Sequence, residues 1–250
     1  MPGSMNCSRP SYWRTLLIPI MLLLLGSLAP AQKNNAARFA QAAKLSGSAA
    51  EVIHTVMSKP EQAIPKELFD QAEAVAVFTN VKKVGFLIEG VSFGSGVVSR
   101  RTPDGWGQPV FYQLRGFRIG PQLEAKSVHV VLLLMNDGAI KLIWEKRKKP
   151  LPEHQLPVAG PVGEIRSDRK DVLPVADIFS YTLTDGRFAG QDLQRFFQNF
   201  VLYPDNKLNK AIYNLEAKDL LAGGQKITIN QSQAEINAFP EALAQHSRRH

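Results

Sequence analysis

Residues Gly90–Gly94 (GVSFG) show the pattern G-x-S-x-G, in which Ser92 stands where many serine hydrolases carry their nucleophile. That nucleophile lies on a sharp turn between a strand and a helix. A strand is predicted directly before it, over 84–88, but Phe93–Val98 combines two glycines with two valines and predicts a second strand. The chain therefore has the letters of this motif without the helix that positions a nucleophile.

A serine nucleophile also needs a histidine, and four histidines follow Ser92. His129 lies inside an apolar segment that predicts a strand, and we expect it to be packed there. His154 lies in a proline-rich segment, and His246 and His250 lie close to the end of the chain. None of them stands in a pattern that completes a catalytic triad, and we predict no catalytic residue.

Two other patterns are associated with cofactors or metals in some proteins. Gly94-x-Gly96 starts like a dinucleotide-binding loop, but Ser99 stands at the third position and no helix is predicted to begin there. Asp168 and Asp171 stand among basic residues, which is typical of a solvated, charge-balanced loop. No group of His, Cys, Asp and Glu has the spacing of metal ligands. We therefore predict a protein that is not an enzyme and that holds neither a metal ion nor a cofactor.

Residues 1–31 have the features of a secretory signal peptide. Two arginines give a basic start, an apolar run of 13 residues follows (Leu16–Leu28), and Ala29–Ala31 has the A-x-A form of a cleavage site. A membrane-spanning helix would need about 20 apolar residues. We expect export, cleavage near Ala31, and a periplasmic or extracellular mature chain.

The chain is basic, with 30 lysines and arginines against 22 acidic residues and a formal net charge of +8. Removal of the signal peptide takes away Arg9 and Arg14 and leaves a net charge of about +6. Such a charge favours anionic partners such as membrane surfaces and wall polymers. Nucleic acid is also anionic, but export separates the chain from it. The single cysteine, Cys7, is lost with the signal peptide, so we expect a domain that is held by its core without disulfides.

The spacing of apolar residues predicts an α+β fold, with a largely antiparallel, glycine-rich sheet or barrel-like core between N-terminal and C-terminal helices. Helical spacing is found over 32–59, 65–69, 139–144, 205–221 and 232–245. Short β-branched, apolar segments predict strands over 74–78, 84–88, 91–99, 110–114, 128–135 and 178–183. Turns are predicted between them, at Asn80, Asp104-Gly105, Gly116 and Asn136–Gly138. The connections are too short for crossover helices, so neighbouring strands should be antiparallel.

Several motifs, taken in their order along the chain, resemble the glycine-rich core of the SYLF domain family of lipid-binding domains and actin regulators. They are Phe93–Val98, Arg100-Arg101, Asp104–Trp106, Pro109–Phe111, Val130–Asp137, Ala159–Gly163, Phe179–Tyr181, Gly186–Gly190 and Tyr203–Asp205. The resemblance runs from about Ala36 to Gly223 and implies a lipid-binding domain over 32–225, followed by a C-terminal helix and tail over 226–250. For eukaryotic relatives it also implies phosphoinositides and actin. An exported chain meets neither in its compartment, so we expect lipid binding and set actin aside.

The candidate binding residues form three basic clusters, which are Lys146-Arg147-Lys148-Lys149, Lys82-Lys83 and Arg100-Arg101. Each basic residue near an anionic membrane contributes about 1 kcal/mol of attraction. The apolar face of the first helix, with Leu45 and Val52, is either a second membrane contact or part of the core. A cavity between sheet and helices that holds a single lipid also stays open. The alternative function is an envelope scaffold that binds a protein or an acidic wall polymer.

Overall fold

The computed structural model describes residues 29–86, 89–119, 128–144, 157–163, 176–184, 187–190, 200–222 and 231–247. The chain divides into two units, Met1–Arg38 and Phe39–His250. Of the first unit, the structure describes only the beginning of helix α2 (Ala29–Met57). Every other element belongs to the second unit.

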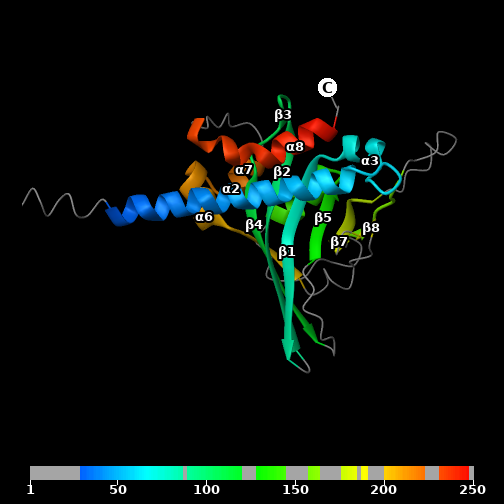
Figure 1. Cartoon of the computed structure of the whole chain (residues 1–250), viewed down its shortest axis with the longest axis horizontal. Helices are drawn as coiled ribbons and strands as arrows, with labels where there is room; N and C mark the ends of the chain where they lie inside the picture. The colour runs from blue at the N-terminus through cyan, green and yellow to red at the C-terminus, as the bar shows by residue number, and fades with distance from the viewer. Residues whose placement is uncertain are drawn as a thin grey trace, which may run out of the picture. The chain divides into compact units, whose positions relative to one another are not determined.

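A nine-stranded sheet forms the centre of the second unit (Figure 1). Its strands are β1 (Ala74–Phe86), β2 (Glu89–Thr102), β3 (Gly105–Trp106), β4 (Val110–Ile119), β5 (Val128–Leu134), β6 (Val158–Ala159), β7 (Ile178–Thr184), β8 (Arg187–Gly190) and β9 (Phe200–Pro204). The order is β6-β7-β5-β1-β2-β4-β9, with β3 paired to β2 and β8 paired to β7. Only the β6–β7 pair is parallel among the described strands. The predicted α+β fold with a largely antiparallel sheet is therefore confirmed. Of the two forms that the sequence left open, the described strands form an open sheet and not a barrel.

The sheet is buried on both faces in its central strands. Side chains alternate along a strand, so Val75 and Val77 of β1 enter one core while Ala74, Ala76 and Phe78 enter the other. Strands that are covered on both sides read as continuous apolar runs. That is why AVAVF in β1 and VVLLL in β5 contain no polar residue.

Helices cover the two faces of the sheet. The first core lies under α2, α3 (Lys66–Gln71), α6 (Asn206–Tyr213) and α8 (Ala238–His246), and the second lies under α4 (Asp137–Trp144) and α7 (Ala217–Leu221). The buried Ser46 of α2 donates to the Ile236 carbonyl at 2.5 Å and accepts from the Phe239 N–H at 3.0 Å, which attaches the C-terminal segment to α2. None of the helices in the described part of the chain is long and apolar enough to cross a membrane.

The first correction to the predicted elements concerns Asn80, where we predicted a turn between two strands. The structure has one long strand, β1, whose register with β2 shifts between Thr79 and Lys82. Asn80 has a φ of 52°, a left-handed conformation that asparagine tolerates better than most residues. The asparagine therefore makes a β-bulge, and the strand continues beyond it. Gly116 is likewise not a turn but a position within β4, opposite Ser92.

The second correction concerns residues 205–221, which we predicted as one helix. The chain forms α6 and α7, and Asn214 between them has a left-handed φ of 58°. Leu208 and Ile212 of α6 enter the first core, whereas Leu221 of α7 enters the second. A single straight helix could not reach both faces of the sheet, so the break is required by packing.

The C-terminal segment, which we predicted as a helix and tail that follow the domain, is packed into the core. A 3₁₀ helix, η3 (Gln231–Asn237), leads into α8, and Phe239 and Leu243 are fully buried in the first core. Ser247, which lies beyond the helix predicted over 232–245, is 8% exposed. The segment is therefore part of the second unit, because it closes the first core.

Asn209 offers a sharp test of this fold. It is fully buried on α6, and its side chain accepts from the Phe111 N–H at 2.9 Å and donates to the Phe111 carbonyl at 3.0 Å. Asn209→Asp replaces the donor by a buried charge, so we expect a loss of about 3 kcal/mol in the free energy of unfolding. Urea denaturation measures it, with Asn35→Asp at an exposed asparagine of α2 as the matched control. Equal stability of the two variants would contradict the two hydrogen bonds that the structure assigns to the buried Asn209 side chain.

Candidate functional site

Ser92 lies in the middle of β2, opposite Lys83 on one side and Gly116 on the other. The strand continues to Thr102, so no helix follows the serine. The prediction that the G-x-S-x-G segment is strand and not a strand-to-helix turn is therefore confirmed.

The described histidines do not gather at a reactive serine. His129 is half-buried in β5, its Nδ1 atom has no partner among the described residues, and burial lowers its pKa. His246 Nε2 lies 3.1 Å from His54 Nδ1, and its pKa is lowered first by burial and then by the charge of His54. His154 and His250, like Asp168 and Asp171, lie outside the described residues. Within the described ranges, no three His, Cys, Asp or Glu side chains are placed to hold a metal ion.

The structure describes two of the three predicted basic clusters, and only one of them with its side chains. Lys146–Lys149 lies outside the described residues. For Lys82 and Lys83 it describes the backbone, which lies in β1 just beyond the bulge, opposite Phe93 and Ser92. Arg100 connects three elements, because it donates from β2 to the Leu221 carbonyl of α7 at 2.5 Å and lies 2.7 Å from the Asp137 carboxylate of α4.

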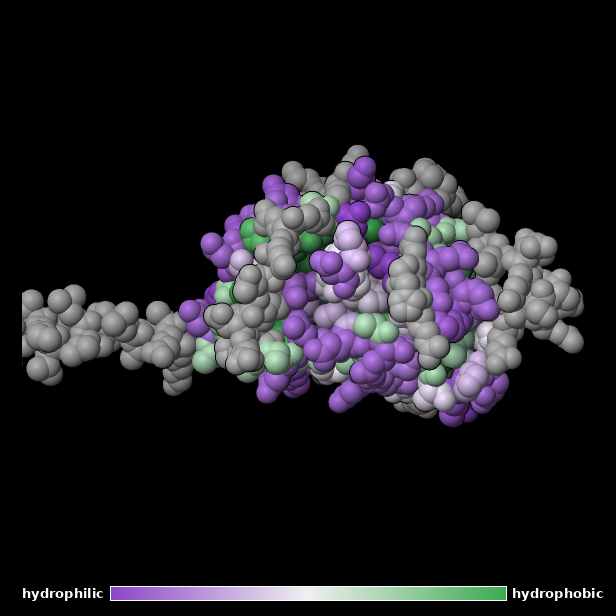
Figure 2. Space-filling model, turned by 90° about the horizontal axis from the view of Figure 1, so that it is seen from above, coloured by the Kyte–Doolittle hydropathy of each residue, from purple (hydrophilic) through white to green (hydrophobic). Residues whose placement is uncertain are grey.

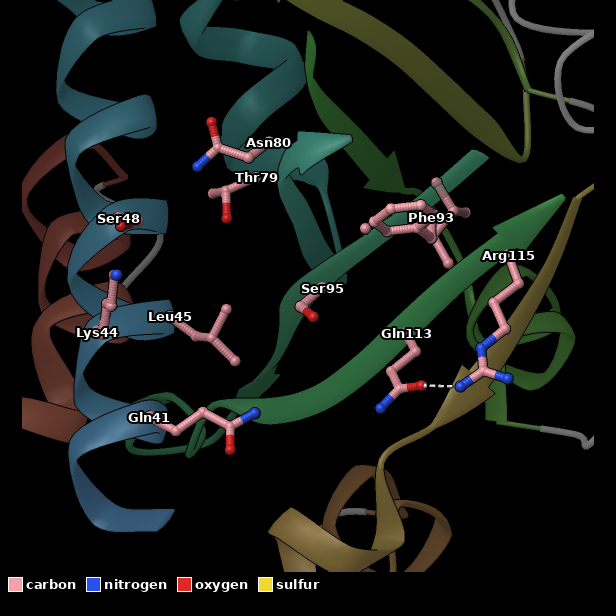
Figure 3. A pocket seen from close by; sticks show the side chains of 12 residues that line it. Gln41, Lys44, Leu45, Ser48, Thr79, Asn80, Phe93, Ser95, Gln113 and Arg115 are labelled. Atoms are coloured by element: carbon pink, nitrogen blue, oxygen red, sulfur yellow. Dashed lines mark hydrogen bonds between the residues drawn. The ribbon is translucent and has the colours of Figure 1, made fainter. Parts of the chain in front are cut away.

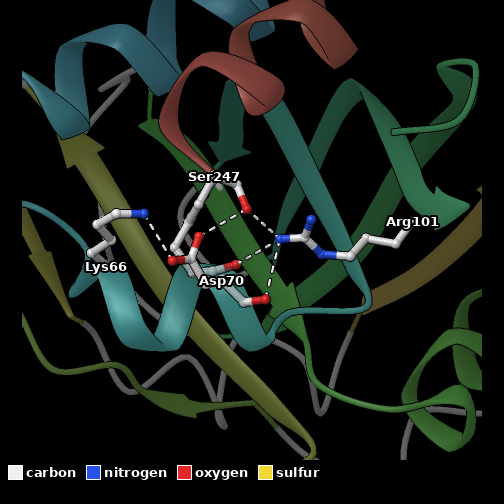
Figure 4. Close-up of polar contacts among 5 residues, drawn as sticks. Lys66, Asp70, Arg101 and Ser247 are labelled. Atoms are coloured by element: carbon white, nitrogen blue, oxygen red, sulfur yellow. Dashed lines mark hydrogen bonds and ion pairs between the residues drawn. The ribbon is translucent and has the colours of Figure 1, made fainter. Parts of the chain in front are cut away.

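Arg101 has a denser set of contacts inside the protein (Figure 4). Its guanidinium lies 4.2 Å from the ring centre of Trp106 and donates to the backbone carbonyls of Ala72 at 2.8 Å, Asp70 at 3.2 Å and Phe69 at 3.4 Å. It also donates to the Ser247 hydroxyl, which in turn donates to the Asp70 carboxylate at 2.9 Å. Lipid binding by Arg100 and Arg101 stays a prediction, and both side chains already have structural partners.

A cleft that the sequence did not reveal lies between α2 and the sheet (Figure 3). Its volume is about 710 Å³. The lining residues come from four elements: Gln41, Lys44, Leu45 and Ser48 of α2, Thr79 and Asn80 of β1, Phe93, Gly94 and Ser95 of β2, and Gln113, Leu114 and Arg115 of β4.

The cleft forms where the apolar core gives way to polar residues on both walls. Along β2, Val97 is fully buried, Ser95 is partly exposed, and Phe93 is 47% exposed. Along β4 the same succession runs from buried Phe111 through Gln113 to exposed Arg115. The facing positions of α2 are spaced by three and four residues, so they lie on one side of the helix. Of the four α2 residues that line the cleft, three are polar and do not pack into the apolar core. The helix and the sheet therefore leave room between them at this point.

The cleft is cationic and has an ordered polar wall. Lys44 and Arg115 are both exposed, and no acidic residue is among the described residues that line it. Arg115 donates to the Gln113 side chain at 2.8 Å, and Gln113 donates to the Asp205 carboxylate at 2.9 Å. This chain of hydrogen bonds orients the guanidinium. Because Leu45 and Phe93 add apolar surface, the arrangement suits a ligand with an anionic group and an apolar part.

A scan against protein-family models matches residues 115–246 to the family described as Ysc84, Las17-binding protein actin regulator. Comparisons with curated proteins and with solved structures give no match. The matched range begins at Arg115, so the motifs between Phe93 and Phe111 precede it, while the Ala159–Gly163 and Phe179–Tyr181 motifs lie within it. The match covers more than half of the 250 residues, and the chain belongs to the Ysc84 family of SYLF domains.

Proposed function

We propose that this chain is a non-enzymatic module of the cell envelope that binds anionic phospholipid, with the lipid headgroup in the cleft. The observation that carries the proposal is the pairing of two exposed cations, Lys44 and Arg115, with the half-exposed ring of Phe93 in a cleft whose described lining is free of acidic residues. Membership of a family of lipid- or actin-related binding domains supports it.

The chemistry of the cleft fits a phosphate ester. Hydrogen bonds between a charged donor and an anionic oxygen are about twice as strong as neutral ones, and arginine matches phosphate with two parallel donors. The hydroxyl and amide groups of Ser48, Thr79 and Gln41 add further donors to the lining of the cleft. The net charge of about +6 that remains without the signal peptide adds long-range attraction to an anionic surface.

The cellular setting rests on the predicted signal peptide, which favours the envelope over a compartment that contains actin. An envelope scaffold that binds a protein or an acidic wall polymer is the competing function. A scaffold would not require an anionic lipid surface, so vesicle binding separates the two.

Reversing the charge of the cleft is expected to weaken vesicle binding. The test uses the chain from Gln32 to His250, because it contains the whole second unit and lacks the apolar run Leu16–Leu28, which could itself enter a bilayer. Removing two cations from an anionic surface costs about 2 kcal/mol, or roughly 30-fold in partitioning. Lys44→Glu with Arg115→Glu should therefore lower co-sedimentation with phosphatidylglycerol vesicles by at least this factor.

The matched control reverses Lys141 and Lys218, two exposed lysines on the helices that cover the opposite face of the sheet. Both double variants exchange two positive charges for two negative ones. Binding that falls equally in both variants would show that overall charge and not the cleft governs it. A third variant, with Lys146–Lys149 changed to glutamate, tests the basic cluster predicted from the sequence.

A further inference from the structure

Two histidines that are far apart in the sequence face each other at the surface. His54 lies in the last turn of α2, and His246 lies in the last turn of α8. The Nδ1 atom of His54 is 3.1 Å from the Nε2 atom of His246, and the two rings meet edge to face with their centres 5.3 Å apart. The packing of α8 on α2 thus joins two imidazoles that are 192 residues apart.

The backbone at both histidines is fixed by the first core. On α2, Ile53 directly before His54 is fully buried. On α8, Leu243 is fully buried one turn before His246, and Ser247 directly after it is held by the hydrogen bonds described above. The two rings are therefore presented by rigid elements, which lowers the free-energy cost of holding a ligand between them.

The pair is open to solvent. His54 is exposed and His246 is half-buried. Helix α8 lies on the side of the molecule that Figure 2 shows, where hydrophilic residues predominate and hydrophobic ones form small groups. An ion in water can therefore reach the two facing nitrogens without crossing the core.

Both rings can serve as neutral ligands. The pKa of His246 is lowered, first by burial and then by the charge of His54, so this ring is neutral at neutral pH. In the hydrogen-bonded pair, one of the two facing nitrogens carries a proton. When both facing nitrogens bind a metal ion, that proton is exchanged through solvent for one on the other nitrogen of the same ring. Both imidazoles then stay neutral, which is the form that binds metals.

The distance between the facing nitrogens fits two ligands of one metal ion. Zn²⁺ binds histidine nitrogen at about 2.0–2.1 Å, so two such nitrogens are about 2.9 Å apart at a right angle and about 3.3 Å apart at the tetrahedral angle. The observed distance of 3.1 Å lies between these values. Imidazole is a ligand for Zn²⁺, Ni²⁺ and Cu²⁺, whereas Mg²⁺ and Ca²⁺ prefer oxygen.

We propose that His54 and His246 bind a divalent transition-metal ion of the Zn²⁺ class, which bridges α2 and α8. Among the described residues no third His, Cys, Asp or Glu side chain joins the pair, so water completes the coordination. The sequence predicted no metal site, because the two histidines come together only in the fold. The bound ion fastens the C-terminal segment to α2 and stabilises the first core. This site is separate from the cleft and does not depend on the proposed function.

Calorimetric titration of the untagged chain from Gln32 to His250 with ZnCl₂ tests the proposal. We expect one Zn²⁺ ion per chain and a melting temperature that rises by several degrees, because the ion binds the folded state. MgCl₂ at the same ionic strength should give neither effect. His54→Ala and His246→Ala should each abolish both effects, while the matched control His154→Ala should retain them. Thermal unfolding without metal confirms that each variant is folded.

Two results would overturn the proposal. One is the absence of both binding heat and a melting shift when Zn²⁺ is added to the original chain. The other is a Zn²⁺ effect that survives His54→Ala. If that effect is lost in His250→Ala, the ion is held by the end of the chain, where His246 and His250 are four residues apart, and not between the helices. Vesicle binding is measured separately, so either result leaves the proposed function standing.

Discussion

Replacing Arg101 with alanine is expected to lower the free energy of unfolding by about 3 kcal/mol, because charged hydrogen bonds and a cation–π contact are lost together. The guanidinium binds three backbone carbonyls at the C-terminal end of α3 and the Ser247 hydroxyl at the end of α8, while it stacks on Trp106. Without it, the carbonyls lose a charged donor and the C-terminal segment loses its attachment to β2. Urea denaturation of the chain from Gln32 to His250 measures the effect.

Two further variants interpret that measurement. Arg101→Lys keeps the charge but lacks the planar set of donors, so it should recover less than half of the lost stability. Arg115→Ala removes an exposed arginine and should change the stability by no more than about 0.5 kcal/mol. If Arg101→Ala and Arg115→Ala unfold at the same urea concentration, Arg101 is not the structural residue described above.

Replacing Gly160 with alanine is expected to destabilise the protein by a similar amount, about 3 kcal/mol, through overpacking. A Cβ atom at Gly160 would overlap Cζ and Oη of Tyr181. Tyr181 cannot move away easily, because it is fully buried in the first core and stacks on Phe188 with a ring-centre distance of 5.2 Å. Differential scanning calorimetry should show a clearly lower melting temperature.

The matched control is Gly47→Ala in α2, where a Cβ atom would meet nothing within 4 Å apart from the neighbouring residues and backbone of its own helix. Alanine is favoured over glycine inside a helix by up to about 1 kcal/mol, so this variant should be slightly more stable than the original chain. The same substitution thus has opposite expected effects at the two sites. A Gly160→Ala chain that melts with or above the Gly47→Ala chain would refute the packing of Tyr181 described here.

Much of the sheet was predictable because burial on both faces leaves a plain mark in the sequence. Runs such as 74–78 and 128–135 are long enough and apolar enough to identify central strands. Asn80 was wrongly predicted as a turn, because an asparagine with positive φ suits a turn and a bulge equally well. Only the pairing of the residues that follow Asn80 with β2 shows that the strand continues and that Asn80 forms a bulge. The break at Asn214 was missed because the helical spacing of apolar residues continues through it. The residues before Asn214 pack into the first core, and those after it pack into the second core on the other face of the sheet.

The candidate site was harder to predict, and the reason is geometric. Clusters of adjacent basic residues were taken as candidate binding residues, because charge is the only sign of a lipid surface that the sequence offers locally. Lys82-Lys83 and Arg100-Arg101 both lie in strands, and lipid binding by these residues stays a prediction. Lys44 and Arg115 line the same cleft only because α2 lies over the sheet in the fold, which no local sequence pattern records.

Flotation of the chain from Gln32 to His250 with vesicles tests the central claim most directly. Neutral phosphatidylcholine vesicles are compared with vesicles that also contain phosphatidylglycerol, at low and at physiological salt. Binding through exposed cations should appear with the anionic vesicles and weaken as salt screens the charges. The account predicts flotation with phosphatidylglycerol, strongest at low salt, and little with phosphatidylcholine alone. Absence of flotation under every condition would contradict it and favour the scaffold function.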